Sequence, residues 1–334
     1  MSHRLQGQDW LTTSATRAVM AALAAAGGPG CARFVGGCVR NALIGAPIDD
    51  IDIATTLTPD AVVAALKAAG LRSVPTGIEH GTVTGLSEHQ PFEITTLRRD
   101  VSTDGRRATV AFTTDWAEDA GRRDFRLNAL YADADGVILD PTGQGFDDAM
   151  AGRIVFVGQP EGRIREDYLR ILRFYRFYAW YGRGAPDAAA VAACAALAEG
   201  VEQLSAERVS KELLKLLAAP DPRPAVRLMA EAGVLGRVLP PTDLILFEAM
   251  TAVSPDPVLR LSALLPADPA RTAEVARRLR LSNAQRDRLV EAVGGEVGLG
   301  LTEPQARAMI YRDGRQAFED RVMRAWAMAG EAEE

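Results

Sequence analysis

The stretch Phe34-Val35-Gly36-Gly37-Cys38-Val39-Arg40, followed ten residues later by Asp50-Ile51-Asp52, decides the fold that we expect for this chain. Its residue types predict a strand, a glycine turn, a short helix and then a second strand that carries two carboxylates. In an extended strand alternate side chains share one face, so Asp50 and Asp52 are expected to point together while the isoleucines beside them enter the core.

The two carboxylates and the glycine turn predict a site for phosphate and a metal ion. Carboxylates held close together repel each other unless a cation lies between them. Mg²⁺ suits such a pair, because it takes one or two carboxylates together with substrate phosphates. The turn at Gly36 and Gly37 opens a helix N-terminus, where free backbone N–H groups can receive phosphate. We therefore expect a Mg²⁺-dependent site for a nucleoside triphosphate, with Asp50 and Asp52 as the metal ligands.

Two further stretches supply candidates for the same site. Glu93 alternates with apolar neighbours in a predicted strand and is the best candidate for a third, catalytic carboxylate, the alternative being a solvent-facing glutamate. Residues 122–130 combine cations, a carboxylate and an amide before an apolar run. There Arg123 can bind a triphosphate, and Asp124 or Asn128 can hydrogen-bond a ribose hydroxyl. A salt-bridged linker between strands is the alternative for this stretch.

A second centre lies in the stretch 166–177, EDYLRILRFYRF. Asp167 and Arg170 are three residues apart and are therefore neighbours on a helix. Cytosine and adenine both present an exocyclic amine beside a ring-nitrogen acceptor, which Asp and Arg can read together. Uracil and guanine present the opposite polarity and would leave both charges unpaired. The pair could thus select C and A without a nucleic-acid template, or be a plain intrahelical ion pair.

Strand signals are confined to the N-terminal part of the chain, which predicts an α+β head followed by an all-helical remainder. The expected strands are 33–36, 50–54, 81–86, 91–97, 108–113 and 128–132, and the expected helices of the head are 11–26, 38–44 and 59–69. From about residue 148 the periodicity is helical, with breaks at 183–186, 219–223, 239–242, 254–257 and 294–300.

Composition narrows the class of protein. The 334 residues carry a net charge of −6, which argues against indiscriminate coating of nucleic acid, although arginines gather in 163–176 and 271–288. For 271–288 a solvated helix face with ion pairs is an equal alternative. The three cysteines have no paired spacing and the three histidines form no cluster, so we expect no zinc site or disulfide framework and a cytoplasmic location. No segment predicts a membrane span.

An ordered set of motifs resembles the class II tRNA nucleotidyltransferases, which comprise the CCA-adding enzymes and the bacterial poly(A) polymerases. The motifs are GGCVR, DID, HGT, RRDF with NAL, DPTGQG, EDYLRILRFYRF and LSAERVSKELLKLL, and they lie between residues 36 and 217. The resemblance extends from about residue 9 to 240 and weakly to 290. It implies a DNA-polymerase-beta-like head over 1–138, and a helical neck, body and tail over 139–205, 206–265 and 266–334.

The resemblance also implies roles for individual residues. It makes Asp50 and Asp52 metal ligands and Asp167 with Arg170 an amino-acid template. Segment 98–118 matches a flexible loop thought to help the change from CTP to ATP. The implied triphosphate or nucleotide contacts are Gly36, Gly37, Arg40, Arg123, Arg173 and Arg176. On a regular helix, however, Arg176 would lie about 180° round from Asp167.

The chain departs from the family pattern at three positions. Asn41 stands where Asp is usual and is expected to weaken an internal ion pair, Tyr168 replaces a common Pro, and Arg126 a common Thr. The implied activity is template-independent addition of CCA to the tRNA 3′ end from CTP and ATP, with Mg²⁺. Alternatives are a poly(A) polymerase, an enzyme that adds only C or only A, and a non-catalytic RNA-binding relative. RNA contacts are expected from Arg277, Arg278 and Arg280.

Overall fold

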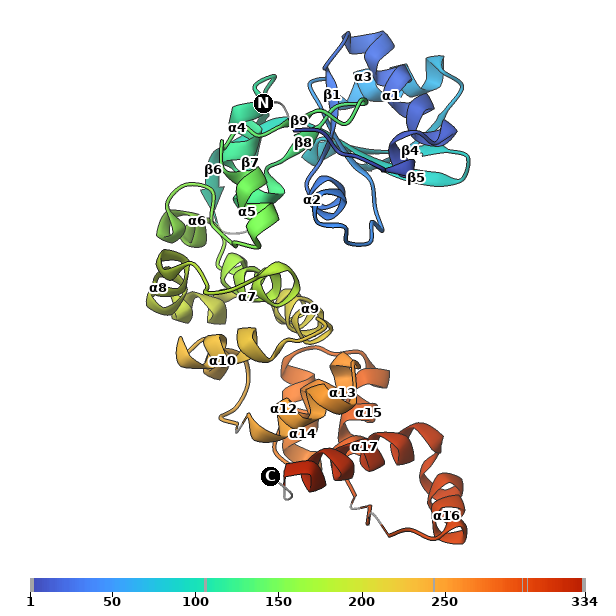
Figure 1. The fold of residues 1–334 in the computed structure, drawn as a ribbon, viewed down its shortest axis with the longest axis vertical. Helices are drawn as coiled ribbons and strands as arrows, with labels where there is room; N and C mark the ends of the chain where they lie inside the picture. The colour runs from blue at the N-terminus through green and yellow to red at the C-terminus, as the bar shows by residue number, and fades with distance from the viewer. Residues whose placement is uncertain (1–2, 105–106, 243, 296, 299, 332–334) are drawn as a thin grey trace. The chain divides into compact units, whose positions relative to one another are not determined.

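The computed structural model describes residues 3–104, 107–242, 244–295, 297–298 and 300–331 (Figure 1). The chain divides into two compact units. The first comprises residues 1–166 with 183–187, and the second comprises 167–182 with 188–334. An α+β unit is thus followed by a helical one, as the sequence predicts.

The first unit is built on a seven-stranded sheet in the order β3-β4-β5-β2-β1-β8-β9. Only the central β2–β5 pair is parallel, and the other neighbouring pairs are antiparallel. A second, two-stranded sheet is the hairpin of β6 and β7. The strands are β1 Ala32–Val35, β2 Asp52–Thr55, β3 Arg72–Gly77, β4 Thr82–Ser87, β5 Gln90–Thr96, β6 Arg98–Asp104, β7 Arg107–Phe112, β8 Tyr131–Ala132 and β9 Ile138–Leu139.

Helices α1 and α3 pack on each other and against the β3–β4 part of the sheet (Figure 1). Both begin at a threonine, Thr13 or Thr58, whose side chain accepts a hydrogen bond from the first turn and so satisfies one of the free N–H groups there. The helices of this unit are α1 Ser14–Gly27, α2 Gly37–Ile44, α3 Pro59–Ala68, α4 Trp116–Gly121, α5 Gly145–Ala151 and α6 Pro160–Glu166.

The core of the sheet lies in β1, β2 and β5, where Phe34, Ile53, Phe92 and Ile94 are fully buried. In β5 the buried residues alternate with more exposed ones, which fixes the register, since a slip by one residue would turn the apolar set to solvent. Phe34 pairs with Ile53 across the antiparallel β1–β2 ladder.

The second unit contains only helices among its described residues. They are α7 Leu169–Tyr181, α8 Ala188–Ala196, α9 Ala206–Leu217, α10 Arg223–Glu231, α11 Leu235–Val238, α12 Ile245–Val253, α13 Pro257–Ala263, α14 Pro269–Arg278, α15 Asn283–Val293, α16 Glu303–Asp313 and α17 Arg315–Glu331, with a 3₁₀ turn at Ala198–Gln203. Among the described residues the predicted breaks fall between helices, except that Arg223 and Pro257 already begin helices, and residues 296 and 299 of the last break lie outside the described residues. Across the described residues, no helix combines the length and apolar character needed to traverse a bilayer.

A buried arginine holds the middle of this unit together. Arg260 is 2% exposed, and its guanidinium donates to the carbonyls of Leu217 at 2.7 Å, Ala219 at 2.6 Å and Ser254 at 2.7 Å. The ends of α9 and α12 have carbonyls without a partner in their own helix, and one delocalised cation satisfies both.

Four sequence expectations for the head need correction. Strand β3 was not expected, and β6 occupies part of the segment predicted only as a loop. The predicted strand 128–132 is instead a 3₁₀ turn, Arg126–Asn128, followed by the two-residue β8. Strand β2 begins at Asp52, so Asp50 precedes the strand.

Candidate active site

The glycine turn after β1 depends on a backbone conformation that side chains disfavour. Gly36 has φ 71°, caps α2, and donates its N–H to the carbonyl of Leu130 at 3.1 Å. A Cβ placed on Gly36 would lie 3.6 Å from Nη1 of Arg123. The turn therefore brings bare backbone, the start of a helix and a guanidinium together, which is the chemistry of an anion site.

The carboxylates lie on neighbouring central strands. Asp52 on β2 is opposite Glu93 on β5 in the parallel register. Asp50 is exposed in the irregular segment before β2, while Ile51 is 6% exposed and Ile53 is fully buried, so the two isoleucines enter the core as expected even though the strand starts later.

Asp52 is half-buried among other carboxylates. Burial, and then repulsion from Glu93 and Asp50, raise the pKa of Asp52 to about 6, and Arg123 only partly opposes the shift. A bound cation would relieve this repulsion and favour the ionised carboxylate.

The donor set fits Mg²⁺ better than a metal enclosed by protein ligands. In the described part of the chain no three His, Cys, Asp or Glu residues are arranged to hold a metal ion on their own. A site with two aspartates is compatible with Mg²⁺, since this ion takes its remaining ligands from water and substrate phosphates. Asp50 and Asp52 are the residues that would hold it.

Helix α2 carries the next candidate, Arg40, which is 6% exposed. Its Nη1 donates to Oδ1 of Asn128 at 2.5 Å, and Asn128 in turn donates from Nδ2 to Asp124 at 3.0 Å. The structure therefore brings Arg40, Asp124 and Asn128 together in one network. Asn41 accepts from Nε and Nη2 of Arg40 at 3.1 and 2.8 Å, so its carboxamide keeps a polar contact with Arg40 where the family usually has a carboxylate.

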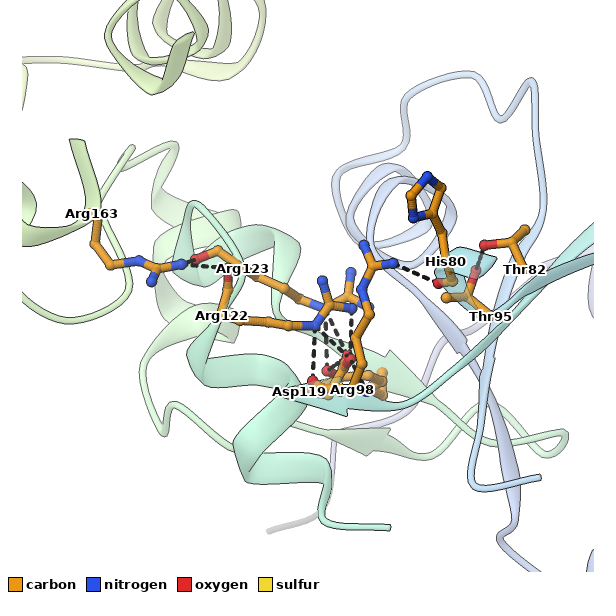
Figure 2. A network of polar contacts seen from close by, with 9 residues as sticks. His80, Thr82, Thr95, Arg98, Asp119, Arg122, Arg123 and Arg163 are labelled. Atoms are coloured by element: carbon orange, nitrogen blue, oxygen red, sulfur yellow. Dashed lines mark hydrogen bonds and ion pairs between the residues drawn. The ribbon is translucent and has the colours of Figure 1, made fainter. Parts of the chain in front are cut away.

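Arg123 is held by a buried carboxylate that the sequence analysis did not single out (Figure 2). Asp119 of α4 is 1% exposed and accepts hydrogen bonds from Arg122 and Arg123. Burial alone would raise the pKa of Asp119, but Arg123 and Arg122 outweigh it and lower the pKa to about 2. The guanidinium of Arg163 adds hydrogen bonds to the carbonyls of Arg122 and Arg123.

In the second unit the predicted template pair is arranged differently from a helical i,i+3 pair. Helix α6 ends at Glu166 and α7 begins at Leu169, so Asp167 lies in the connection and not on a helix. Its Oδ1 accepts from the N–H of Leu169 at 3.1 Å, and its Oδ2 pairs with Arg208 of α9 at 2.6 Å. Arg170 donates its backbone N–H to the carbonyl of Asp167 at 3.0 Å, which keeps the two residues adjacent.

The other two arginines of this motif face α9. Arg176 pairs with Glu212 at 2.5 Å, and Arg173 lies 3.8 Å from the same carboxylate. Glu212 and Arg208 are one helical turn apart, so Arg176 and Asp167 contact the same side of α9. The angle of about 180° expected on a regular helix does not apply, because Asp167 precedes α7.

The three arginines predicted to bind RNA are exposed, and each has a contact within the chain. Arg277 donates to the carbonyl of Ala273 in its own helix, Arg278 to that of Val238, and Arg280 pairs with Glu207 at 2.5 Å. These arginines are therefore exposed to solvent even though each one also has a partner within the chain.

The sequence analysis missed three residues that hold the candidates in place: Asp119, Arg208 and Glu212. Arg208 and Glu212 lie inside the quoted motif LSAERVSKELLKLL, whose presence was the available signal. Asp119 precedes the quoted RRDF motif by three residues, and nothing local distinguishes it from the neighbouring Glu118.

Two family models match the chain. One, described as "Poly A polymerase head domain", matches residues 32–155, and the other, "Probable RNA and SrmB- binding site of polymerase A", matches residues 186–246. The human protein "CCA tRNA nucleotidyltransferase 1, mitochondrial" is 37% identical over 241 residues, which are 70% of this chain and 55% of the relative. The CCA-adding enzyme of Geobacillus thermodenitrificans is 38% identical over 206 residues, 61% of this chain and 49% of the relative.

Among solved structures, the Bacillus stearothermophilus CCA-adding enzyme in complex with CTP superposes with a TM-score of 0.70 and 27% identity, covering 96% of this chain and 79% of that one. The chain spans about half the length of the curated relatives it matches. The two family matches together cover more than half of the chain and agree with the relatives and the fold, so the chain belongs to the tRNA nucleotidyltransferase and poly(A) polymerase family.

Proposed function

We propose that this protein adds CCA to the 3′ end of tRNA, using CTP and ATP without a nucleic-acid template and with Mg²⁺ as cofactor. The observation that carries the proposal is the position of Asp52 beside Glu93 on adjacent central strands, with Arg123 next to the Gly36 turn. Relatives named as CCA-adding enzymes support the choice of substrates.

The reaction we propose is attack of the tRNA 3′-hydroxyl on the α-phosphorus of the nucleoside triphosphate. The new O3′–Pα bond forms as the bond to pyrophosphate breaks, and the hydroxyl proton passes to one of the active-site carboxylates. Asp50 and Asp52 would hold Mg²⁺ in this scheme, and the ion would supply charge neutralisation for the phosphoryl transfer. Glu93 adds negative charge at the same place. The Gly36 and Gly37 turn, Arg40 and Arg123 align the triphosphate, which lowers the barrier by positioning and by charge stabilisation.

Selection of the nucleotide belongs to the second unit in this proposal. Asp167 accepts from the exocyclic amine of cytosine or adenine, and Arg170 donates to the ring nitrogen. Because Asp167 pairs with Arg208 in the free protein, the base competes with Arg208 for this carboxylate. Arg173 and Arg176 complete the nucleotide contacts, and Asp124 and Asn128 serve the ribose.

We also propose the division into head, neck, body and tail at 1–138, 139–205, 206–265 and 266–334, with RNA bound partly through Arg277, Arg278 and Arg280. The three free, buried cysteines support a reducing location, for which we propose the cytoplasm. Mitochondrial relatives make the location a separate question from the activity.

Incorporation of single labelled nucleotides onto three tRNA transcripts, ending at the discriminator base, at C and at CC, tests the proposal. We expect C, C and then one A, refusal of UTP and GTP, and loss of all incorporation when the metal is chelated. Repeated A addition would identify a poly(A) polymerase, and a stop after CC or activity only on the CC end would identify a partial enzyme. No incorporation on any transcript would refute the proposed function.

A further inference from the structure

We propose that Asp119 is a positioning residue for nucleotidyl transfer: it fixes the Arg123 guanidinium against the Gly36 turn and joins it to the base of the β6–β7 hairpin. This inference rests on the proposed function, because it assigns Arg123 to the triphosphate. Asp119 itself touches no substrate in this scheme and acts through Arg123.

The two carboxylate oxygens of Asp119 accept hydrogen bonds from two different groups of residues. Oδ2 accepts from Nε and Nη2 of Arg123 at 3.2 and 3.0 Å and from the hydroxyl of Tyr131 at 2.7 Å. The Tyr131 hydroxyl also accepts from Nε of Arg123 at 3.2 Å. One edge of the guanidinium is therefore fully engaged, which aims the remaining nitrogen, Nη1, at the Gly36 turn.

Oδ1 serves the hairpin. It accepts from the backbone N–H of Arg98, the first residue of β6, at 3.2 Å, and from Nε and Nη2 of Arg122 at 3.0 and 2.7 Å. Arg122 returns a hydrogen bond from Nε to the carbonyl of Arg98 at 3.0 Å. The backbone N–H and carbonyl of Arg98 are thereby both hydrogen-bonded to the Asp119–Arg122 pair. A displacement of Arg98 would therefore shift the Asp119 carboxylate, and with it Arg123.

The hairpin base is also tied to the sheet that carries Glu93. Figure 2 shows the Arg98 guanidinium reaching His80, whose carbonyl accepts from Nη1 at 2.6 Å. Close by, the hydroxyls of Thr82 on β4 and Thr95 on β5 lie 3.1 Å apart. The contact with His80, two residues before β4, therefore links the hairpin base to the sheet that carries Glu93.

The charge balance suits an anion-binding role. One buried carboxylate faces two guanidiniums, so the cluster keeps a net positive charge for phosphate while Arg123 is held rigidly. A fixed donor binds more tightly than a mobile one, because the ordering cost has been met before the ligand arrives.

The test compares Asp119→Asn with the native full-length chain. It measures CTP binding at equilibrium and steady-state incorporation of C onto the tRNA transcript that ends at the discriminator base. Asn keeps the shape but places an N–H donor against a guanidinium or a hydroxyl. We expect the Kd and KM for CTP to rise about 10- to 100-fold, the range for losing a charged hydrogen bond, with kcat changed much less. Tyr131→Phe, which removes only one hydroxyl, is expected to raise the KM about 3- to 10-fold and carries the test if Asp119→Asn does not fold.

Asp148→Asn is the matched control. Asp148 is fully buried in the same unit and also pairs with two arginines, Arg126 at 2.7 Å and Arg153 at 2.8 Å. It should destabilise the fold comparably and leave the KM for CTP within about twofold. An equal rise in KM in both variants would reduce Asp119 to a structural role and overturn the proposal.

Two further readouts separate positioning from general damage. Asp119→Asn should lower the preference for CTP over CMP, since only the triphosphate loses a contact, and in an Arg123→Ala background it should raise the KM no further. An unchanged CTP-to-CMP preference, or the same rise with and without Arg123, would overturn the inference. If the native chain incorporates no nucleotide, the proposed function fails independently of these comparisons.

Discussion

At the residue scale, Asp52 carries a conflict between stability and function. Its carboxylate is held near Glu93 and Asp50 in a partly buried place, and burial and these neighbours raise its pKa to about 6. At neutral pH the ionised form of Asp52 therefore costs folding free energy unless a cation is bound beside it. Such strained charges are typical of sites that bind a cation.

Asp52→Asn should therefore abolish activity and raise stability together. Loss of this proposed metal ligand is expected to lower incorporation at least about 1,000-fold. Removal of the repelled charge should raise the free energy of unfolding by about 1 to 3 kcal/mol at pH 7 without metal, following the pKa shift. Asp50→Asn, at an exposed position, should abolish activity with little gain in stability. Urea denaturation of both variants, with and without Mg²⁺, checks the expectation; equal stability of Asp52→Asn and the native chain would contradict it.

Asp119 behaves in the opposite way. Its pKa is lowered to about 2 because Arg123 and Arg122 outweigh the effect of burial. Its contribution to stability is therefore present above the unfolded pKa of about 3.9 and is lost as the pH falls towards 2. The stability gap between the native chain and Asp119→Asn should shrink by about 1 kcal/mol between pH 5 and pH 3. Urea denaturation at several pH values measures the gap, and a constant gap would show that Asp119 is not ionised in a stabilising pair.

At the element scale, prediction from sequence succeeded where burial sets the pattern. Strands β4 and β5 alternate buried and more exposed residues, and β1 and β2 are short runs that are buried at three of their four positions, so all four could be predicted. Strand β3 could not, because it lies at the sheet edge, contains Pro75 and exposes Val74. The partners of Asp119 and Asp167 were equally invisible, because Tyr131 and Arg208 come from other elements, and only the folded chain brings them within hydrogen-bond distance.

Tyr168, in the connection between α6 and α7, packs closely against Gly200. A Cβ on Gly200, in the 3₁₀ turn Ala198–Gln203, would lie 1.9 Å from the ring of Tyr168. Gly200→Ala must therefore displace Tyr168, which follows Asp167 directly. We expect a loss of about 1 to 3 kcal/mol in unfolding free energy, and a smaller discrimination of CTP against UTP. Gly236→Ala, with no neighbour within 4 Å, is the matched control and should change neither quantity adversely. If Gly200→Ala folds and still discriminates CTP from UTP as the native chain does, the position of Tyr168 does not affect base selection.

At the scale of the whole molecule, a net charge of −6 coexists with arginine-rich helices. An acidic protein can still bind RNA through a local basic face, since the salt dependence of binding counts only the phosphates contacted. The family match gives the order of parts along the chain. The residues that touch RNA cannot be predicted from it, because exposed arginines such as Arg280 and Arg307 form ion pairs within the chain.

Arg277 on α14 offers a test of RNA contact by the helical unit, because its described contact is a hydrogen bond to a carbonyl of its own helix. Arg277→Ala should weaken tRNA binding severalfold, reduce the slope of log affinity against log salt by about 0.7 to 0.9, and leave the KM for CTP unchanged. Arg307→Ala, which removes an exposed arginine of α16 paired with Glu303, is the matched control. Filter binding of labelled tRNA across a salt series measures both variants. Equal salt slopes for Arg277→Ala and the native chain would show that Arg277 does not contact a phosphate. Binding through one phosphate contact fewer must release one counterion fewer.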